Sequence, residues 1–262
     1  QYDQLFVGTR PLSMGGAFIA VADDANAITW NPAGLPGLRR TEFTSTYADL
    51  YDMGISQSYL GFVRPFSDRI AIGVDWSNVG FDDKELAYSE NKLNFALGFQ
   101  PFKKLSLGLT LKYLMRDMLL DDASYGKGSG IGYDAGILAQ PKKNLKIGMG
   151  LYDLGGTSVS YKDKTTEKIL GQAFKLGISY MPINGLTIAT DFGDRFQFGA
   201  EYILASRVSF RAGIQQGLDN NNEKDILVPS AGLSLKFKNV LMEYGFESHP
   251  FLNPTHRFTL AL

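Results

Sequence analysis

The chain contains no cysteine, and only two of its 262 residues are histidine. Without cysteine it can form no disulfide framework, no Cys-based zinc site and no thiol nucleophile. Two histidines leave little material for a His-based metal centre, and the sequence offers no convincing Ser-His-Asp grouping. We therefore predict a protein that is not an enzyme and that carries no metal and no cofactor.

An excess of charge of one sign and a long apolar run are also missing. The 26 Lys and Arg are balanced by 27 Asp and Glu, and the formal net charge of −1 argues against a nucleic-acid partner. No stretch approaches the roughly 18 to 20 unbroken apolar residues that a membrane helix requires.

The sequence begins at Gln1 with neither Met nor a basic-then-apolar leader. From this we expect a mature chain whose signal peptide has been removed.

From about residue 42 to its end the chain shows alternation of apolar and polar residues. In the clearest run, four leucines and a tyrosine alternate with small or polar residues from Leu105 to Tyr113. Hydrophobic residues make up 44% of the sequence, which is enough for an ordered structure. Alternation with a period of two is typical of β-strands, and counting every such segment predicts about fourteen strands.

The connections between these strands alternate in length. Short turns are expected at 65–68, 101–104, 141–144, 182–185, 205–206 and 238–239. Longer polar connections are expected at 78–91, 116–130, 153–171, 217–225 and 248–255. A chain that turns tightly at one end and loosely at the other predicts an antiparallel meander, and closing it into a barrel removes the exposed edges.

Alternation alone does not tell whether the apolar face points into a core or out into lipid. A closed sheet of about fourteen strands has a lumen too wide for one layer of side chains to fill. The polar face carries charges of both signs, as a wet lumen would: Asp75, Lys112, Lys146, Lys175, Asp191, Glu201, Arg211, Lys236, Glu243 and Arg257. Aromatic residues near the turns match an interfacial girdle, namely Phe66, Phe102, Tyr113, Tyr180 and Phe237. We therefore predict an all-β fold, a transmembrane β-barrel of about 14 antiparallel strands surrounded by outer-membrane lipid. A soluble two-sheet sandwich is the alternative.

Charged and glycine residues on the polar face each allow two interpretations. The charges either pair with one another and with groups inside the barrel, or line a polar pathway that sets selectivity. Glycines recur near mid-strand at Gly73, Gly98, Gly108, Gly136, Gly148, Gly177, Gly199, Gly213, Gly232 and Gly245. Glycine is costly in a strand interior. These glycines therefore either provide the curvature of the barrel or make room for a plug or a ligand.

The first forty or so residues break the strand pattern and are rich in small and apolar side chains. We expect a short helix that is capped within the pair 23–24, continues through Thr29 and is stopped by Pro32. The segment is too apolar for a solvated tail and too irregular for a strand. We therefore predict an N-terminal hatch, residues 1–41, inside the lumen of a barrel formed by residues 42–262.

Several hatch residues are candidates for a ligand pocket. They are Arg10, Met14, Gly15, Gly16, Phe18, Ile19, Asp23, Asp24, Trp30, Asn31, Pro32 and Ala33. An apolar pocket is expected beside Phe18, Ile19 and Trp30. The two adjacent aspartates are expected to cap a helix and to form hydrogen bonds within the hatch, because adjacency does not give the geometry of an acid/base pair.

Three motifs of the predicted hatch carry a resemblance to a known family. They are Met14-Gly15-Gly16-Ala17, Ala22-Asp23-Asp24-Ala25 and Trp30-Asn31-Pro32-Ala33-Gly34-Leu35. Together they resemble the N-terminal signature of the FadL superfamily of outer-membrane barrels, and within it the PorV/PorQ-like branch. The resemblance covers the first forty residues. It implies a fourteen-stranded barrel with an internal N-terminal hatch, in the outer membrane of a Gram-negative bacterium.

This resemblance implies two functions. The first is passive transport or binding of small hydrophobic molecules, such as fatty acids, gated by the hatch. The long connections are, however, too short for the large capture region of FadL-type transporters, and the PorV/PorQ-like relatives include accessory proteins of type IX secretion. The second hypothesis is therefore an interaction barrel with a closed lumen that docks a secretion system or other surface proteins.

Overall fold

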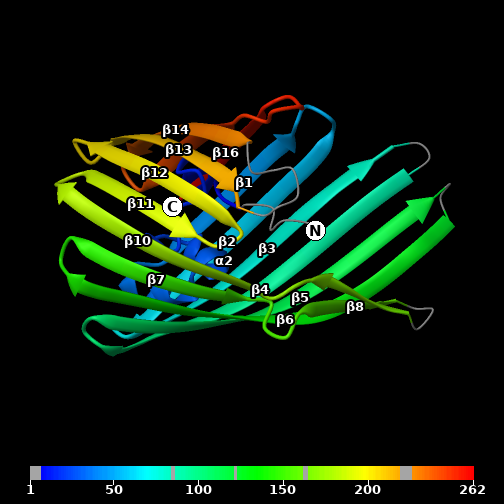
Figure 1. Cartoon of the computed structure of the whole chain (residues 1–262), viewed down its shortest axis with the longest axis horizontal. Helices are drawn as coiled ribbons and strands as arrows, with labels where there is room; N and C mark the ends of the chain where they lie inside the picture. The colour runs from blue at the N-terminus through cyan, green and yellow to red at the C-terminus, as the bar shows by residue number, and fades with distance from the viewer. Residues whose placement is uncertain (1–6, 84–85, 121–122, 162–164, 219–225) are drawn as a thin grey trace.

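A closed antiparallel barrel dominates the molecule (Figure 1). The computed structural model describes residues 7–83, 86–120, 123–161, 165–218 and 226–262. Its strands are β1 (Glu42–Leu50), β2 (Ile55–Ser67), β3 (Ile70–Asp82), β4 (Leu86–Phe102), β5 (Leu105–Leu120), β6 (Ala123–Lys142), β7 (Leu145–Tyr152), β8 (Thr157–Tyr161), β9 (Thr166–Leu170), β10 (Ala173–Ile183), β11 (Leu186–Phe192), β12 (Arg195–Leu204), β13 (Val208–Gly217), β14 (Leu227–Phe237), β15 (Val240–Glu247) and β16 (Thr255–Ala261).

Fourteen of these strands, β1–β7 and β10–β16, form the wall. Each pairs with its neighbour in the chain, β7 pairs with β10, and β1 closes the barrel by pairing with β16. In that closing pair, Tyr47 of β1 lies opposite Phe258 of β16. The predicted fold class and strand count are thus confirmed, and the two-sheet sandwich is wrong.

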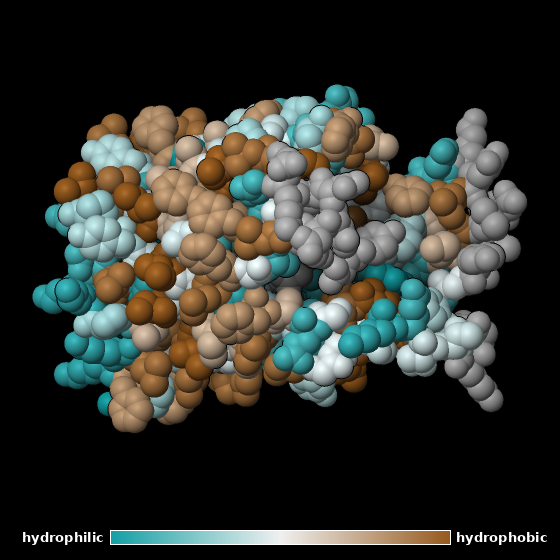
Figure 2. Space-filling view, viewed as in Figure 1, coloured by the Kyte–Doolittle hydropathy of each residue, from teal (hydrophilic) through white to brown (hydrophobic). Residues whose placement is uncertain are grey.

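The two faces of the wall differ in polarity because successive side chains of a strand point to opposite sides. On β5, Leu109 is 60% exposed on the outer face, whereas Thr110 is only 2% exposed on the inner face. Figure 2 shows hydrophobic residues gathered over the wall on the visible side. An apolar outer band and a polar interior are the pattern of membrane-spanning barrels. Within the described ranges, no helix has the length and the apolar character needed to cross a membrane.

At the end of the barrel that carries the long connections, the strands are longer than predicted. Strands β3 to β6 occupy most of 78–91 and 116–130, and β8 and β9 form a hairpin on β6 within 153–171. Those segments were expected to be polar loops. The hydrogen bonds between paired strands join backbone groups, so a strand can continue through a segment of polar side chains. As a result β3–β6 project well beyond β10–β15 at one end of the barrel (Figure 1).

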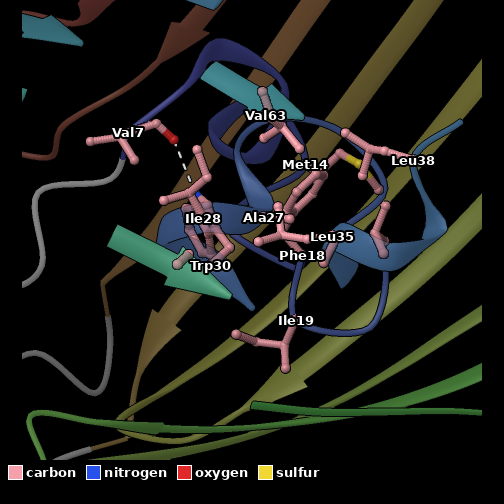
Figure 3. Close-up of a cluster of buried hydrophobic side chains, with 14 of the residues drawn as sticks. Val7, Met14, Phe18, Ile19, Ala27, Ile28, Trp30, Leu35, Leu38 and Val63 are labelled. Carbon is pink, nitrogen blue, oxygen red and sulfur yellow. Dashed lines mark hydrogen bonds between the residues drawn. The ribbon is translucent and has the colours of Figure 1, made fainter. Parts of the chain in front are cut away.

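Residues 7–38, which we call the luminal segment, lie against the inside of the wall. They contain α1 (Thr9–Ser13), α2 (Ala27–Trp30) and the 3-10 helix η1 (Pro32–Gly37). Figure 3 shows how Phe18, Ile28 and Leu35, all fully buried, gather into a small core within it. Residues 1–6 of the predicted hatch lie outside the described residues.

The helices of the luminal segment are shorter than expected. The helix predicted after the aspartate pair begins only at Ala27, although Asp24 does cap the turn before it by accepting a 2.8 Å hydrogen bond from the backbone N–H of Asn26. Helix α1 was not predicted, because five residues with Pro11 among them carry no helical periodicity. Both helices gain their order from contact with the wall, since helices this short are not stable alone.

Candidate functional site

Ten glycines create the space that the luminal segment occupies. They are the glycines noted in the sequence, on β3–β7, β10 and β12–β15. A Cβ atom on any of them would come within 3.0 Å of the luminal segment. Several face each other across neighbouring strands, for example Gly98 with Gly108 and Gly199 with Gly213, so they lie at one level of the barrel. Of the two interpretations above, the structure therefore shows that these glycines make room for a segment inside the lumen.

Two acidic residues of the wall bind the backbone and side chains of the luminal segment. Asp191 on β11 accepts hydrogen bonds from the backbone N–H groups of Phe18 and Ile19, at 2.7 and 2.8 Å. Asp75 on β3 accepts a 2.8 Å hydrogen bond from the hydroxyl of Thr29. Carboxylates form hydrogen bonds about twice as strong as those of neutral acceptors. Each thus fixes a different part of the luminal segment to the wall.

Arg10 of α1 is the centre of a larger ionic network. Its guanidinium contacts both carboxylate oxygens of Glu201 on β12, at 2.9 and 2.7 Å. It also contacts Asp23 at 2.7 Å and Asp24 at 2.8 Å. Burial raises the pKa of Asp23, but the positive charges of Arg10 and Lys146 outweigh it, and the pKa lies below its usual value. The network therefore joins two parts of the luminal segment to each other and to the wall.

The same network extends to further charged residues on the inner face of the wall. Arg211 on β13 contacts Glu201 at 2.7 Å and Glu243 on β15 at 2.9 Å, and all three side chains are at most 3% exposed. Lys146 on β7 lies 3.7 Å from Asp23 and donates to the carbonyl of Val21. These lumen charges are therefore paired with one another and with the luminal segment.

A second ionic cluster lies where β7 ends. The ammonium of Lys112 lies 2.7 Å from Asp134 and 2.5 Å from Asp153. Asp153 also accepts a 2.6 Å hydrogen bond from the hydroxyl of Thr157, at the start of the β8–β9 hairpin. Asp153 has a φ of 50°, so the cluster stabilises an unusual bend of the chain. This cluster fixes the point at which the hairpin leaves the wall.

Three predicted lumen charges remain. Arg257 on β16 is buried, and its guanidinium donates a hydrogen bond to Gln57 on β2. Lys175 on β10 is buried, and its ammonium lies 3.7 Å from Asp194. Lys236 on β14 is exposed beside the short turn that follows it.

The luminal segment separates two cavities. The turn-side cavity, of about 390 Å³, lies toward the short turns. Its lining is rich in charge: Arg10, Asp23, Asp24, Arg40, Glu42, Glu201, Arg207, Arg211, Lys236 and Glu243. Any molecule that crossed the barrel through this cavity would therefore meet charged groups on most sides.

The loop-side cavity, of about 440 Å³, lies toward the long connections. More than half of its lining is apolar or aromatic: Val7, Trp30, Leu50, Tyr51, Ile55, Val79, Phe81, Leu86, Tyr88, Met118, Tyr152 and Leu170. Trp30 belongs to its floor, where the indole N–H donates a 3.0 Å hydrogen bond to the carbonyl of Val7 (Figure 3). Tyr152 donates to the carbonyl of Trp30 from the wall. The floor is therefore a rigid part of the luminal segment.

A reversal of polarity along the strands produces this apolar lining. Up to Trp76, the outer face of β3 is apolar and its inner face is small or polar. Beyond it, Asn78 is on the outer face, where its amide hydrogen-bonds to Asn91 at 3.2 Å, and Val79 and Phe81 turn inward to the cavity. The projecting part of β3 is thus polar outside and apolar inside. Leu86 and Tyr88 of β4 and Met118 of β5 add apolar groups to the same cavity, beside the ion pair of Glu90 with Arg116.

The predicted hatch residues lie in different surroundings. Of the three residues expected beside a pocket, Trp30 lines the loop-side cavity, whereas Phe18 and Ile19 are fully buried. Phe18 instead packs edge-on against Trp30, with ring centroids 6.0 Å apart.

The remaining predicted hatch residues pack against the wall. Met14 and Gly15 contact Gly199 and Gly213, Gly16 continues their turn with a φ of 79°, and Pro32 and Ala33 contact Gly108. The amide of Asn31 donates to the carbonyls of Ile19 and Ile137, at 2.8 and 3.2 Å.

The sequence analysis did not identify the apolar residues of the projecting strands. Val79, Phe81 and Met118 fall in segments that were expected to be loops. The available signal is the change of phase after Trp76, where apolar residues move from even to odd positions of β3. Among the described residues, no three His, Cys, Asp or Glu side chains are arranged to hold a metal ion.

Comparison with known proteins gives similarity of fold without similarity of sequence. No protein-family model and no curated protein matches the chain. Solved structures do match it. The CymD monoaromatic hydrocarbon channel has a TM-score of 0.70 at 15% identity, over 100% of this chain and 97% of its own. The Ralstonia pickettii toluene transporter TbuX has a TM-score of 0.68 at 13% identity, over 100% and 98%. A Pseudomonas aeruginosa FadL homologue has a TM-score of 0.68 at 11% identity, over 97% of each chain. The chain thus has the fold of these FadL-like barrels.

Proposed function

We propose that the chain is a non-enzymatic channel of the bacterial outer membrane, through which small hydrophobic molecules pass passively. The observation that carries this proposal is the loop-side cavity, because its walls turn apolar where the strands project beyond the outer apolar band. A cavity of about 440 Å³ is within the usual range for a small-molecule site, roughly 300 to 1,000 Å³. The similar structures described as hydrocarbon channels and toluene transporters agree with this class of substrate.

The luminal segment is the hatch of this channel. It occupies the level of the ten glycines and lies between the two cavities, so a molecule bound at Trp30 cannot cross to the turn-side cavity while the hatch is in place. The hatch is attached to the wall by ionic and hydrogen-bonded contacts at Glu201, Asp191 and Asp75. Gating therefore requires some of these contacts to break.

Fluorescence of Trp30 tests whether the loop-side cavity binds such molecules. The chain has two tryptophans, and in the Trp76→Phe variant only Trp30 emits. We expect toluene or laurate to change this emission in a saturable way. Val79→Ser in the same background should weaken binding about fivefold, because one apolar contact in the cavity is lost. Val74→Ser, on the outer face of the same strand, is the matched control and should leave the affinity unchanged.

Two results would overturn this assignment. One is emission of Trp30 that does not respond to any of these molecules, and the other is an equal effect of Val74→Ser and Val79→Ser. Uptake of toluene into proteoliposomes then separates binding from transport. An interaction barrel of the PorV/PorQ-like type, docking a secretion system through a closed lumen, would bind no ligand at Trp30 and admit none.

A further inference from the structure

The short-turn end of the barrel carries a continuous arc of basic side chains. Arg64 and Arg69 flank the turn between β2 and β3, Lys103 and Lys104 form the turn between β4 and β5, and Lys142 and Lys143 belong to the turn between β6 and β7. All six are exposed.

Backbone hydrogen bonds join these turns. Gln100 donates to the carbonyl of Arg69, and Gln140 donates to the carbonyl of Lys104, each at 2.8 Å. The ammonium of Lys104 also donates to the carbonyl of Pro141. The three turns are therefore neighbours, and their positive charges form one arc.

The arc has little negative charge of its own. Asp68 is the one acidic residue in these three turns, and it lies 3.6 Å from Arg39, outside the arc. Among the described residues, Arg69, Lys103, Lys142 and Lys143 form no ion pair. Within the described residues of these turns, the arc therefore carries an excess of positive charge.

The arc lies at the edge of the outer apolar band. Phe66 and Phe102, which are 60% and 69% exposed, stand beside its charges. Arg64 is on the outer face of β2, opposite Ile72 of β3, and its guanidinium lies 5.6 Å from the ring centroid of Phe66. Aromatic rings of this kind mark the headgroup level of a membrane, and a basic side chain on a lipid-facing wall extends its charge to that level.

At the opposite end, the part of the chain that the structure describes forms no such arc. Its segments carry mainly acidic residues, such as Asp49, Asp52, Asp82 and Asp83. Net charge near zero for the whole chain thus conceals a difference between the two ends. Short turns of outer-membrane barrels face the periplasm, so the positive end faces the leaflet that is built from phospholipids.

From this placement we infer that the basic arc binds the phosphate groups of anionic phospholipids in the leaflet at the short-turn end. The position of Arg64 on the lipid-facing wall favours a lipid over a soluble acidic partner, because only a lipid headgroup meets a side chain there. The inference depends on the apolar outer face of the barrel, and it does not depend on transport through the lumen.

Native mass spectrometry of the detergent-purified full chain tests this inference, with phosphatidylglycerol and phosphatidylcholine as probes. The intact chain should retain phosphatidylglycerol in preference to phosphatidylcholine. Lys103→Gln with Lys143→Gln should weaken that retention about tenfold, since each basic residue near an anionic lipid contributes a several-fold effect. Lys104 is left unchanged because it also holds the neighbouring turn.

The matched control is Lys127→Gln with Lys168→Gln at the opposite end, and it should retain phosphatidylglycerol as the intact chain does. Raising the ionic strength to about 1 M, where the Debye length is about 3 Å, should remove the preference in the unaltered chain and requires no variant to fold. Equal retention of the two lipids by the intact chain, or equal losses in the two double variants, would overturn the inference.

Discussion

The two cavities of the lumen have similar volumes but differ in the balance of apolar and charged groups that line them. The loop-side cavity is lined mainly by apolar and aromatic side chains, with Trp30 in its floor. The turn-side cavity is surrounded by charged groups that centre on the pairing of Arg10 with Glu201. Both are bounded by the same luminal segment, so its two sides have different surroundings. One side faces mainly apolar groups, and the other carries the ion pairs that attach the segment to the wall.

This difference indicates which contacts attach the segment most firmly to the wall. Separating a buried ion pair leaves uncompensated charges in a poorly solvated interior, which is strongly unfavourable. The Arg10 network is therefore the main restraint on the proposed hatch. The apolar core around Phe18 instead holds the parts of the segment together.

Removing the segment should abolish the difference between the two cavities, and this is the largest effect that we expect. A barrel without residues 1–40 would have one continuous lumen, lined at mid-height by ten glycines. We predict that planar bilayers with the intact chain show no ion conductance, and that the truncated barrel conducts. A truncated barrel that folds, judged by heat-modifiable mobility in electrophoresis, but stays closed would contradict the role of the segment as the closing element.

Glu201→Gln tests the charged side alone. The substitution keeps the shape of the side chain but removes the charge that pairs with both Arg10 and Arg211. Breaking a buried ion pair costs about 3 to 5 kcal/mol, and we expect the lower end because Arg211 retains Glu243 and Arg10 retains two aspartates. Urea unfolding measures the loss of stability, and limited proteolysis shows whether the luminal segment is released first.

The control for Glu201→Gln is Asp68→Asn, which removes an exposed ion pair with Arg39. An exposed pair contributes about 0 to 1 kcal/mol, so this variant should unfold almost as the intact chain does. If Glu201→Gln were equally mild, the network would not be the restraint that we describe.

Much of the wall could be predicted from its sequence because the determining pattern is local. Alternation from Leu105 to Tyr113 separates the residues of the two faces of the strand, and each tight turn is marked by a few residues. The β8–β9 hairpin could not be predicted, since Thr157–Tyr161 is polar and its order comes from pairing with β6, which is distant in the sequence. Predicting such a strand requires knowledge of its partner.

The candidate site could be predicted only in part, for a similar reason. The glycines and the luminal charges were identifiable because they interrupt a regular pattern, and the structure brings many of them against residues 7–38. The partners of each charge were not identifiable, since Arg10 and Glu201 are 191 positions apart. The apolar cavity wall was missed because Val79 and Phe81 change the phase of the alternation, which resembles the end of a strand.

Substitution of one of the ten glycines tests whether the position of the luminal segment depends on close contact with the wall. In Gly213→Ala, the new methyl group would overlap backbone atoms of Gly15, which cannot move aside as a flexible side chain could. Overpacking of this kind costs about 1 to 3 kcal/mol, less than the loss of the buried charge. Gly171→Ala is the control, because a Cβ at Gly171 meets nothing within 4 Å. If both variants unfold at the same urea concentration, the fit between wall and segment is loose, and the separation of the cavities depends on the ionic contacts alone.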